Sequence, residues 1–488
     1  TAWLGEKSAR PARRILDAAR IATYETPDSS VRGFMHRVRH YRAQELLLET
    51  PAARPDEFAP DAARARRVIA AALGQGREWL DAEEVAQVLS VYGIPLPKSR
   101  LAGDSEGAAE AAAAIGTRVA LKIRSPDLVH KSDLGGVVLD LDGSEAVRIE
   151  AVAMLERLAA ARPGIHIDGF LVQEMVRFPG ALELILGIVG DAVFGPVILF
   201  GQGGTAVEVV RDTTLELPPL NEALARAQMA RTRVWRLLQG YRGQPQAALD
   251  MLALMLVRVG QLAAEQPEIR ELDINPLLAG ARGVVALDAR LRVGSGEAGA
   301  ERLAIRPYPK ELEKSFVLRD GTRLFLRPIR PEDEPLLQEL AGNMSPEDLR
   351  MRFFTPIRGL SHRLAARLSQ IDYDREMALV AFPECGGPAL GVARFSADPD
   401  NARAEYAIGV RTDWHGRGLG YLLMNRLIEV ARGRGIGELV GEVLRENTAM
   451  LRMARELGFS VAGDPADPSL VEVRKPLREA AGRRGPDG

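Results

Sequence analysis

The segment Ala404–Met424, AEYAIGVRTDWHGRGLGYLLM, constrains the fold more tightly than any other part of the chain. It opens with the alternating pattern of a β-strand, continues through a glycine-rich loop and ends in the amphipathic pattern of a helix over Leu419–Arg432. Small residues in such a loop let the backbone approach a ligand closely. Because the first amides of a helix lack intrahelical acceptors and the helix dipole favours anions, we expect the loop to bind a pyrophosphate group.

Neighbouring patterns extend this unit to a whole domain. Downstream, a predicted strand over Leu439–Leu444 leads to a helix over Thr448–Leu457. Upstream, Leu326–Asp333 is predicted to be a strand that runs into the N-terminus of a helix. Gly409 falls near the end of the first strand, and we expect it to break the strand there, where strands of this kind separate and admit a ligand.

Together these patterns resemble the GNAT acetyltransferase family over about residues 315–477. The family's pyrophosphate signature is Gln or Arg, two residues, Gly, one residue, and then Gly or Ala, and this chain departs from it only by His415 in the first position. The resemblance implies that acetyl-CoA is the co-substrate and that it is contacted by Ile408, Val410, His415, Arg417, Gly418, Leu419, Gly420 and Asn447. Many family members carry a tyrosine general acid in the last helix, where this chain has Ala454.

Glu405 stands at the start of the strand that leads into the loop. A protonated amine cannot attack a thioester, so a base must first remove a proton. In the bacterial protein acetyltransferases that this region resembles, a glutamate in the same Ala-Glu-aromatic-Ala setting is that base, which implies the same role for Glu405. The amides near Val410 would polarise the thioester carbonyl. The alternatives are that Glu405 is a surface residue, or that His415 or Glu442 is the base.

The length of 488 residues exceeds one hydrophobic core, so we expect two to four domains. The central region has a helix over Asp81–Tyr92, and its predicted strands are Val119–Arg124, Val137–Leu141, Gly169–Glu174, Leu182–Val189, Val197–Phe200, Arg270–Ile274 and Val284–Asp288. Lys122 lies among apolar residues and needs an anionic partner, which a nucleotide phosphate would supply. Glu174 is placed to meet an adenosine. Asn275 and Asp288 carry the oxygen ligands that Mg²⁺ prefers.

The order of these motifs, with Phe194-Gly195-Pro196 and Gly201–Thr205 between them, resembles the ATP-grasp β part of ADP-forming acyl-CoA synthetases. The resemblance implies that Lys122 and Glu174 bind ATP, and that Asn275 and Asp288 hold Mg²⁺.

The predicted fold class is a multidomain α/β and α+β protein in which an ATP-grasp domain is followed by a GNAT domain. Residues 1–50 resemble the last part of the CoA-ligase α/β domain of the same synthetases, so we expect a preceding portion that this sequence does not contain. The expected segments are an α/β remnant (1–50), a linker (51–76), the ATP-grasp domain (77–292), a second linker (293–312), the GNAT domain (313–477) and a disordered tail (478–488).

Composition narrows the function. The net charge of −2 gives no basic field for nucleic acid or a membrane surface. The sequence contains no run of about 18 apolar residues, so we expect no membrane span. The single cysteine, Cys385, has no disulfide partner, so we expect a cytoplasmic protein.

A synthetase module joined to a C-terminal GNAT domain resembles the Pat-type bacterial protein lysine acetyltransferases. The resemblance implies transfer of an acetyl group from acetyl-CoA to a protein lysine, typically on an acyl-CoA synthetase, with the ATP-grasp part regulatory. Three alternatives remain open: an ADP-forming acyl-CoA ligase with an attached GNAT domain, a module that senses nucleotide or acyl-CoA, and acetylation of a small amine.

Overall fold

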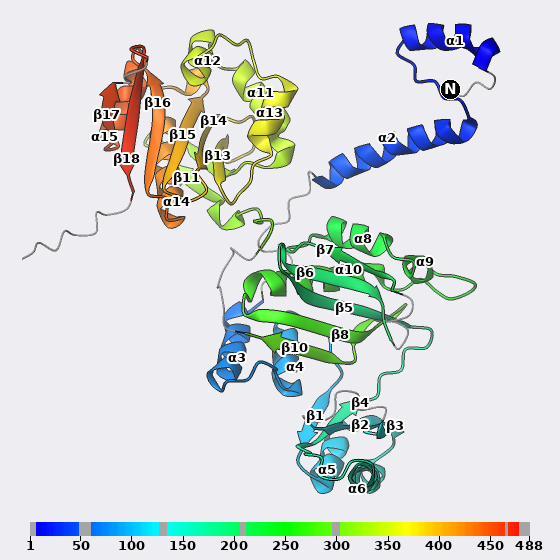
Figure 1. The fold of residues 1–488 in the computed structure, drawn as a ribbon. Coiled ribbons are helices and arrows are strands. Elements are labelled where there is room, and N and C mark those ends of the chain that lie inside the picture. The colour runs from blue at the N-terminus through cyan, green and yellow to red at the C-terminus, as the bar shows by residue number, and fades with distance from the viewer. Residues whose placement is uncertain are drawn as a thin grey trace, which may run out of the picture. The chain divides into compact units, whose positions relative to one another are not determined.

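The structure is a computed structural model that describes residues 6–47, 60–125, 134–204, 211–294, 303–463 and 467–477 (Figure 1). Contacts divide the chain into one unit of Pro51–Pro307 and another that contains Thr1–Thr50 and Tyr308–Gly488. Within the described ranges, no helix combines the length and apolar character needed to cross a membrane. The predicted disordered tail, 478–488, lies outside the described residues.

The N-terminal segment consists of two helices, α1 (Glu6–Ala18) and α2 (Pro27–Leu47). The strand that an α/β unit would contribute is absent from the described residues 6–47, where Tyr24 forms only an isolated bridge. A strand needs pairing along its length, which a single bridge does not provide.

The predicted linker over residues 51–76 is wrong from residue 62 onward. Helix α3 (Ala62–Gly74) occupies that stretch, and the Asp61 carboxylate caps it by accepting the amide of Arg64 at 3.0 Å. Three small or branched side chains at helical spacing, Ala65, Ile69 and Ala72, are completely buried in the core of the central unit. Helix α4 (Ala82–Val91) follows.

The first sheet of the central unit is antiparallel, with the strand order β1-β4-β2-β3. Its strands are β1 (Ser99–Ala102), β2 (Val119–Arg124), β3 (Val137–Leu141) and β4 (Gly169–Glu174). Helices α5 (Ser105–Ile115) and α6 (Ser144–Ala161) pack on one face of this sheet and enclose an apolar core. The bounds of β2, β3 and β4 agree with the sequence prediction.

The second sheet of this unit has the order β10-β8-β5-β6-β7, and β9 pairs with β8. Its strands are β5 (Leu182–Asp191), β6 (Gly195–Gln202), β7 (Thr213–Glu216), β8 (Ile269–Gly280), β9 (Gly283–Ala286) and β10 (Ala289–Val293). Three helices accompany them, α8 (Glu222–Ala230), α9 (Trp235–Leu238) and α10 (Leu249–Glu265). Helix α10 is buried along most of its length against β5 and β6, so it forms the centre of this core.

The C-terminal unit is built on one sheet of eight strands in the order β11-β12-β13-β14-β15-β16-β18-β17. The strands are β11 (Lys314–Val317), β12 (Arg323–Pro328), β13 (Glu376–Pro383), β14 (Gly391–Ala397), β15 (Arg403–Val410), β16 (Glu438–Leu444), β17 (Ser460–Gly463) and β18 (Leu470–Pro476). The helices are α11 (Glu334–Gly342), α12 (Pro346–Phe353), α13 (His362–Ser369), α14 (Leu419–Gly433) and α15 (Thr448–Glu456), with short 3₁₀ turns at Lys310–Leu312, Pro331–Asp333 and Thr412–Trp414. The pairing of β15 with β16 is parallel, whereas the other pairs in this sheet are antiparallel.

This sheet separates two apolar cores. Helices α14 and α15 cover one face, and α11 and α13 pack on the other. Because side chains alternate along β15, Ala404 and Tyr406 enter the first core, whereas Glu405 and Gly409 face the side of α11 and α13.

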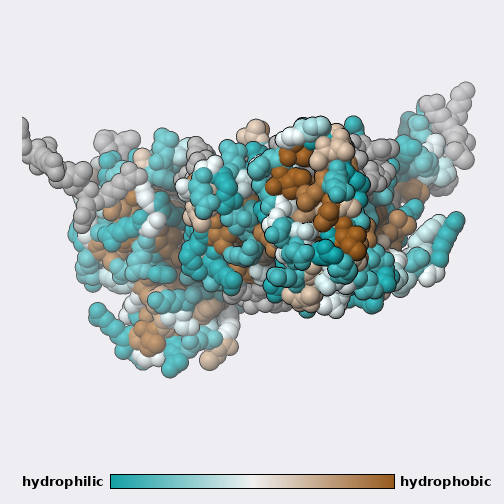
Figure 2. Space-filling view, turned by 90° about the horizontal axis from the view of Figure 1, so that it is seen from below, coloured by the Kyte–Doolittle hydropathy of each residue, from teal (hydrophilic) through white to brown (hydrophobic). Residues whose placement is uncertain are grey.

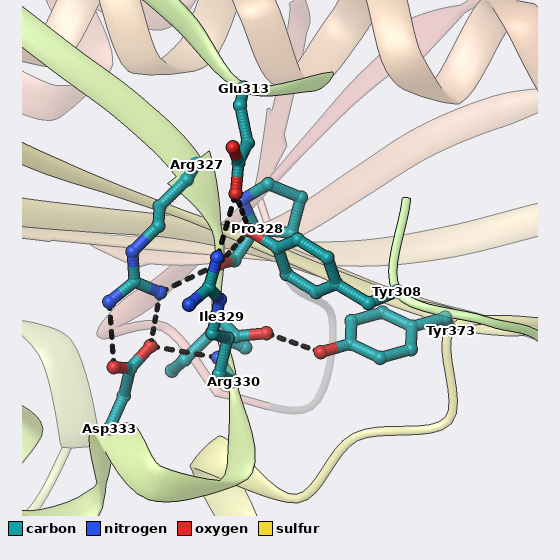
Figure 3. A network of polar contacts seen from close by, with 8 residues as sticks. All are labelled: Tyr308, Glu313, Arg327, Pro328, Ile329, Arg330, Asp333 and Tyr373. Carbon is teal, nitrogen blue, oxygen red and sulfur yellow. Dashed lines mark hydrogen bonds and ion pairs between the residues drawn. The ribbon is translucent and has the colours of Figure 1, made fainter. Parts of the chain in front are cut away.

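The second predicted linker, 293–312, is wrong at its C-terminal end, because Tyr308 belongs to the C-terminal domain (Figure 3). Tyr308 is 3% exposed, and its hydroxyl donates to Glu313 Oε1 at 2.7 Å. The guanidinium of Arg330 donates to the same carboxylate at 2.9 Å and stacks over the Tyr308 ring at 4.7 Å. These contacts fix the entry of the chain into the domain.

Polar side chains dominate the surface seen in Figure 2, with separate apolar areas between them. Two of the exposed apolar side chains, Ile149 and Val152, lie one turn apart on α6 and are 57% and 41% exposed. A small number of exposed apolar residues of this kind is ordinary on protein surfaces.

Candidate functional site

The separation of β15 from β16 shapes the candidate site in the C-terminal domain. Only residues 403–405 of β15 pair with β16, where their partners are residues 438–440. On its other edge β15 stays paired with β14 as far as Val410. The strands therefore part directly after Glu405, and the expectation that Gly409 breaks the strand is wrong, because Gly409 still pairs with Val392.

The glycine-rich loop follows β15 and leads into α14. Gly416 and Gly418 adopt φ angles of 75° and 90°, which favour glycine. A Cβ added at either position would meet no described atom within 4 Å, so this side of the loop is open. The backbone amides that begin α14 lack intrahelical acceptors, which makes the loop suited to an anion.

Two side chains of the loop have defined positions. The guanidinium of Arg417 stacks over the Trp414 ring at 5.0 Å. His415 Nε2 lies 3.2 Å from the carbonyl oxygen of Val410, to which it donates a hydrogen bond. His415 therefore ties the loop to the end of β15, an arrangement that does not favour it as a general base.

The other predicted contacts to acetyl-CoA lie on the elements around the gap. Ile408 and Val410 are half-buried on β15, and Leu419 is fully buried, so Leu419 offers only its backbone to a ligand. A Cβ on Gly420 would lie 3.4 Å from the sulfur of Met453, which shows how closely α14 and α15 approach. Asn447 Oδ1 accepts the amide of Met450 at 3.0 Å and so caps α15.

Glu405 is exposed and lines a hollow of about 270 Å³. The charged residues that line the hollow are Asp398, Arg403, Glu405, Glu442 and Glu472, which are four carboxylates and one guanidinium and give a net charge of −3. Glu442 and Glu472 lie directly opposite each other on β16 and β18, and Arg403 and Arg474 form ion pairs with Glu472. The excess of carboxylates along the hollow favours a positively charged group.

Sequence reasoning missed Arg352, on α12. Its guanidinium lines a small, mainly apolar cavity that also reaches Gly409 and Arg394. Burial, with Arg394 acting in the same direction, lowers the pKa of Arg352 to about 10, and Glu405 acts in the opposite direction. The sequence offered no signal, since an arginine on a short helix is usually a surface residue.

The position of the general acid in many family members is occupied by Ala454, which is 1% exposed. A different tyrosine, Tyr406 on β15, lies in the same core, and its ring packs against Phe459 with a centroid distance of 5.2 Å. Tyr406 is 5% exposed, and its hydroxyl makes no hydrogen bond with the described residues.

In the central unit, the structure brings Lys122, Asn275 and Asp288 together. Lys122 is half-buried on β2, where burial lowers its pKa and the nearby Asp288 partly opposes that effect. The amide of Asn275 donates to the Asp288 carbonyl at 3.2 Å, and Asn275 Oδ1 accepts the amide of Gly204 at 3.0 Å. The middle of β8 is thus joined to the turn between β9 and β10 near the lysine.

Glu174 lies apart from this group, at the end of β4. Its amide donates to the carbonyl of Lys98 at 2.8 Å, and its carboxylate accepts the amide of Lys98 at 3.4 Å. Strand alternation places Gln173 rather than Glu174 on the face of Lys122, and Gln173 Nε2 donates to the carbonyl of Leu287 at 3.2 Å.

The donor set fits Mg²⁺ only together with a nucleotide. Among the described residues, no three His, Cys, Asp or Glu side chains are grouped so that they could hold a metal ion. Mg²⁺ accepts few protein ligands when phosphates and water complete its shell, and Asp288 and Asn275 are of the right chemical type.

Comparison with known proteins assigns a family to each of the two regions that contain these residues. Residues 71–293 match the ATP-grasp domain family, and residues 346–459 match the acetyltransferase (GNAT) family. The chain is 34% identical over 229 residues to the beta subunit of ADP-forming acetate–CoA ligase I from Pyrococcus furiosus, covering 47% of this chain and 97% of that protein. It is also 33% identical over 162 residues to an acetyltransferase of Pseudomonas aeruginosa, covering 33% of this chain and 87% of that protein.

Among solved structures, the chain resembles an acetyl-coenzyme A synthetase from Ca. Korarchaeum cryptofilum in complex with coenzyme A and Ca-AMPCP, with 36% identity, a TM-score of 0.45, and coverage of 47% of this chain and all of that one.

The protein thus combines an ATP-grasp domain with a C-terminal GNAT acetyltransferase domain, and the predicted fold class is confirmed. Through its ATP-grasp domain the chain belongs to the family of ADP-forming acyl-CoA ligases. It spans only 42% and 40% of the lengths of two ADP-forming relatives, an acetate–CoA ligase from Archaeoglobus fulgidus and a 4-hydroxybutyrate–CoA ligase from Nitrosopumilus maritimus.

Proposed function

We propose that the ATP-grasp domain binds ATP or ADP with Mg²⁺ as the nucleotide-binding part of an ADP-forming acyl-CoA ligase. The overall reaction would convert a carboxylic acid, CoA and ATP into acyl-CoA, ADP and phosphate. The observation that carries this proposal is Lys122, a lysine held half-buried beside Asp288 in a domain that covers almost all of a ligase beta subunit. In this arrangement Lys122 would bind phosphate oxygens, and Asp288 and Asn275 would hold Mg²⁺.

The test is ADP binding, measured by calorimetry, and formation of acetyl-CoA from acetate, CoA and ATP by the full chain. We expect Lys122→Met to abolish measurable ADP binding. Arg100→Met removes a charge from exposed Arg100 of the same sheet and should leave binding unchanged. Equal ADP affinity in the wild type and Lys122→Met would refute the assignment.

We further propose that the C-terminal domain transfers an acyl group from acyl-CoA, acetyl-CoA in the simplest case, to an amine. The amides of the Arg417–Gly420 loop would bind the pyrophosphate of CoA, and the acyl group would enter where β15 and β16 part. Glu405 lies at the start of this gap and would take a proton from the ammonium, so that the neutral amine attacks the thioester carbonyl. CoA would leave as the thiolate or take its proton from water.

A protein lysine is the acceptor that the charge around Glu405 favours. The hollow is open, and its net charge of −3 would attract the ammonium of a lysine side chain. As with the Pat-type enzymes that the sequence resembles, an acyl-CoA synthetase is the proposed target, and the ATP-grasp domain would then regulate the transfer.

Labelled acetyl-CoA incubated with the full chain and a cell extract distinguishes the acceptors. Acetylated lysines, found by mass spectrometry, would support protein acetylation, and their dependence on ATP would reveal regulation. Label that appears only in small amines would exclude a protein acceptor while leaving the acyl-transfer chemistry in place.

A further inference from the structure

Arg352 is a half-buried cation on the wall of a mainly apolar cavity. Apolar side chains such as Leu337, Leu340 and Val392 form most of its wall, and Gly409, Arg352 and Arg394 also line it. Arg394 is neutralised by Glu376, whose carboxylate accepts its guanidinium at 3.0 Å. Arg352 stacks over the Phe353 ring at 4.8 Å, but it makes no hydrogen bond or ion pair with the described residues.

A charge in such a place is unfavourable unless something compensates for it. Arg352 is half-buried, so its guanidinium loses part of its hydration, and the apolar groups around it return none of that energy. Glu405 influences Arg352 electrostatically but is exposed and forms no ion pair with it. The missing partner is therefore best supplied by a ligand, and its charge must be negative.

The dimensions of the cavity limit the size of that ligand group. Its volume is about 40 Å³. One water molecule needs roughly 10–15 Å³ measured in this way, so the space accommodates about three water-sized groups. A carboxylate on one methylene has this size, whereas a phosphate with a further substituent does not.

We propose that this cavity binds a carboxylate on a short apolar link, and that Arg352 is its hydrogen-bond donor. A planar guanidinium suits a carboxylate because two parallel N–H donors can meet its two oxygens. The inference rests on the acyl transfer proposed above, since the cavity reaches Gly409, beside the gap at which the thioester is expected. The carboxylate belongs either to the acyl group of the donor, as in succinyl-CoA, or to the acceptor, as in a lysine flanked by an acidic residue.

Two series of substrates separate these sources. The first compares acetyl-CoA, butyryl-CoA and succinyl-CoA with an acceptor peptide in which alanines flank the lysine. The second uses acetyl-CoA with peptides in which aspartate or asparagine flanks the lysine. Because a hydrogen bond to a charged group contributes more than a neutral one, we expect kcat/KM to be about 10- to 100-fold higher for the carboxylate-bearing substrate of one series than for its uncharged analogue.

The variants identify the residue responsible. Arg352→Met should abolish the preference for the carboxylate-bearing substrate, while kcat/KM for the uncharged substrates changes less than about threefold. Arg352→Lys keeps a positive charge and should retain part of that preference. Arg363→Met, at an exposed position on α13, is the control and should keep the full preference. Thermal unfolding of each variant checks that the domain is folded.

Two results would overturn the inference. One is a wild-type protein that has the same kcat/KM for the carboxylate-bearing substrate and its uncharged analogue in both series. The other is an Arg352→Met variant that loses activity equally with all substrates, which would mean a structural role. If no substrate is acylated at all, the proposed acyl transfer itself fails. Binding measurements then still decide whether the cavity selects a carboxylate. They compare the dissociation constants of acetyl-CoA and succinyl-CoA, and of the two peptides in the presence of CoA, between the wild type and Arg352→Met.

Discussion

Glu405 on β15 is paired with Val440 on β16 in the last register pair before these parallel strands separate. The carboxylate consequently lies where the sheet opens and faces the side of α11 and α13, while the glycine-rich loop lies beyond the other end of β15. The proposed base at the start of the gap and the proposed anion site at its end would provide two parts of an acyl-transfer site along one strand.

Replacement of Tyr406 by phenylalanine should stabilise the C-terminal domain. The Tyr406 hydroxyl is buried and makes no hydrogen bond with the described residues, and an unsatisfied buried polar group costs about 1–3 kcal/mol. We expect Tyr406→Phe to raise the free energy of unfolding by about 1 kcal/mol in urea titrations.

Tyr373→Phe is the matched control. Tyr373 is equally buried, but its hydroxyl donates to the carbonyl of Ile329 at 2.5 Å (Figure 3). Its loss should lower the stability by about 1 kcal/mol or more. If Tyr406→Phe lowers the free energy of unfolding as Tyr373→Phe does, the Tyr406 hydroxyl has a hydrogen-bond partner in the folded protein.

The ion pair of Arg327 with Asp333 should be important for folding. The two guanidinium nitrogens donate to the carboxylate at 2.6 and 2.7 Å, and the side chains are only 14% and 4% exposed (Figure 3). Asp333→Asn leaves a buried cation without its counter-charge, and we expect a loss of about 3–5 kcal/mol in the free energy of unfolding.

The exposed pair of Arg426 with Glu429 provides the comparison, because Glu429 is 60% exposed. Glu429→Gln should cost no more than about 1 kcal/mol. Comparable losses for Asp333→Asn and Glu429→Gln in thermal or urea unfolding would contradict the role assigned to burial.

Nucleotide binding should weaken at alkaline pH. Only the protonated form of Lys122 attracts phosphate, and burial lowers the pKa of Lys122 below its ordinary 10.5. The affinity for ADP should therefore fall as the pH rises through that lowered pKa, before a surface lysine would lose its proton. Lys122→Arg should bind more weakly at pH 7 but keep its affinity at high pH, because arginine stays protonated. Calorimetric titrations from pH 7 to 10 test this, and parallel pH dependences of the two proteins would argue against Lys122.

Strong local patterns predicted much of this fold. The strands around Lys122 and the helix after Gly418 were placed within a residue or two, because their hydrophobic periodicity and turn residues agree with their final environment. The three prolines and many alanines within residues 51–66 are misleading, since the buried face of α3 is formed largely by small residues whose partners are distant in sequence.

The parts of the candidate site that depend on tertiary packing could not be predicted. Arg352 becomes conspicuous only when the packing of α12 places it on the wall of a cavity that reaches Gly409. The hydroxyl of Tyr406 is buried only because Phe459 and the neighbouring strand surround it. Likewise, strand pairing rather than Gly409 determines where β15 and β16 separate.

The most direct test of the account is the rate of acyl transfer by Glu405→Gln, with Glu442→Gln as the control from the same hollow. The substitution keeps the size of the side chain and removes its ability to accept a proton. We expect kcat for acetyl transfer to an amine to fall about 100-fold, a typical contribution of a general base, while the dissociation constant of acetyl-CoA stays unchanged. Turnover by Glu405→Gln close to that of the wild type would contradict the assignment of Glu405 as the base.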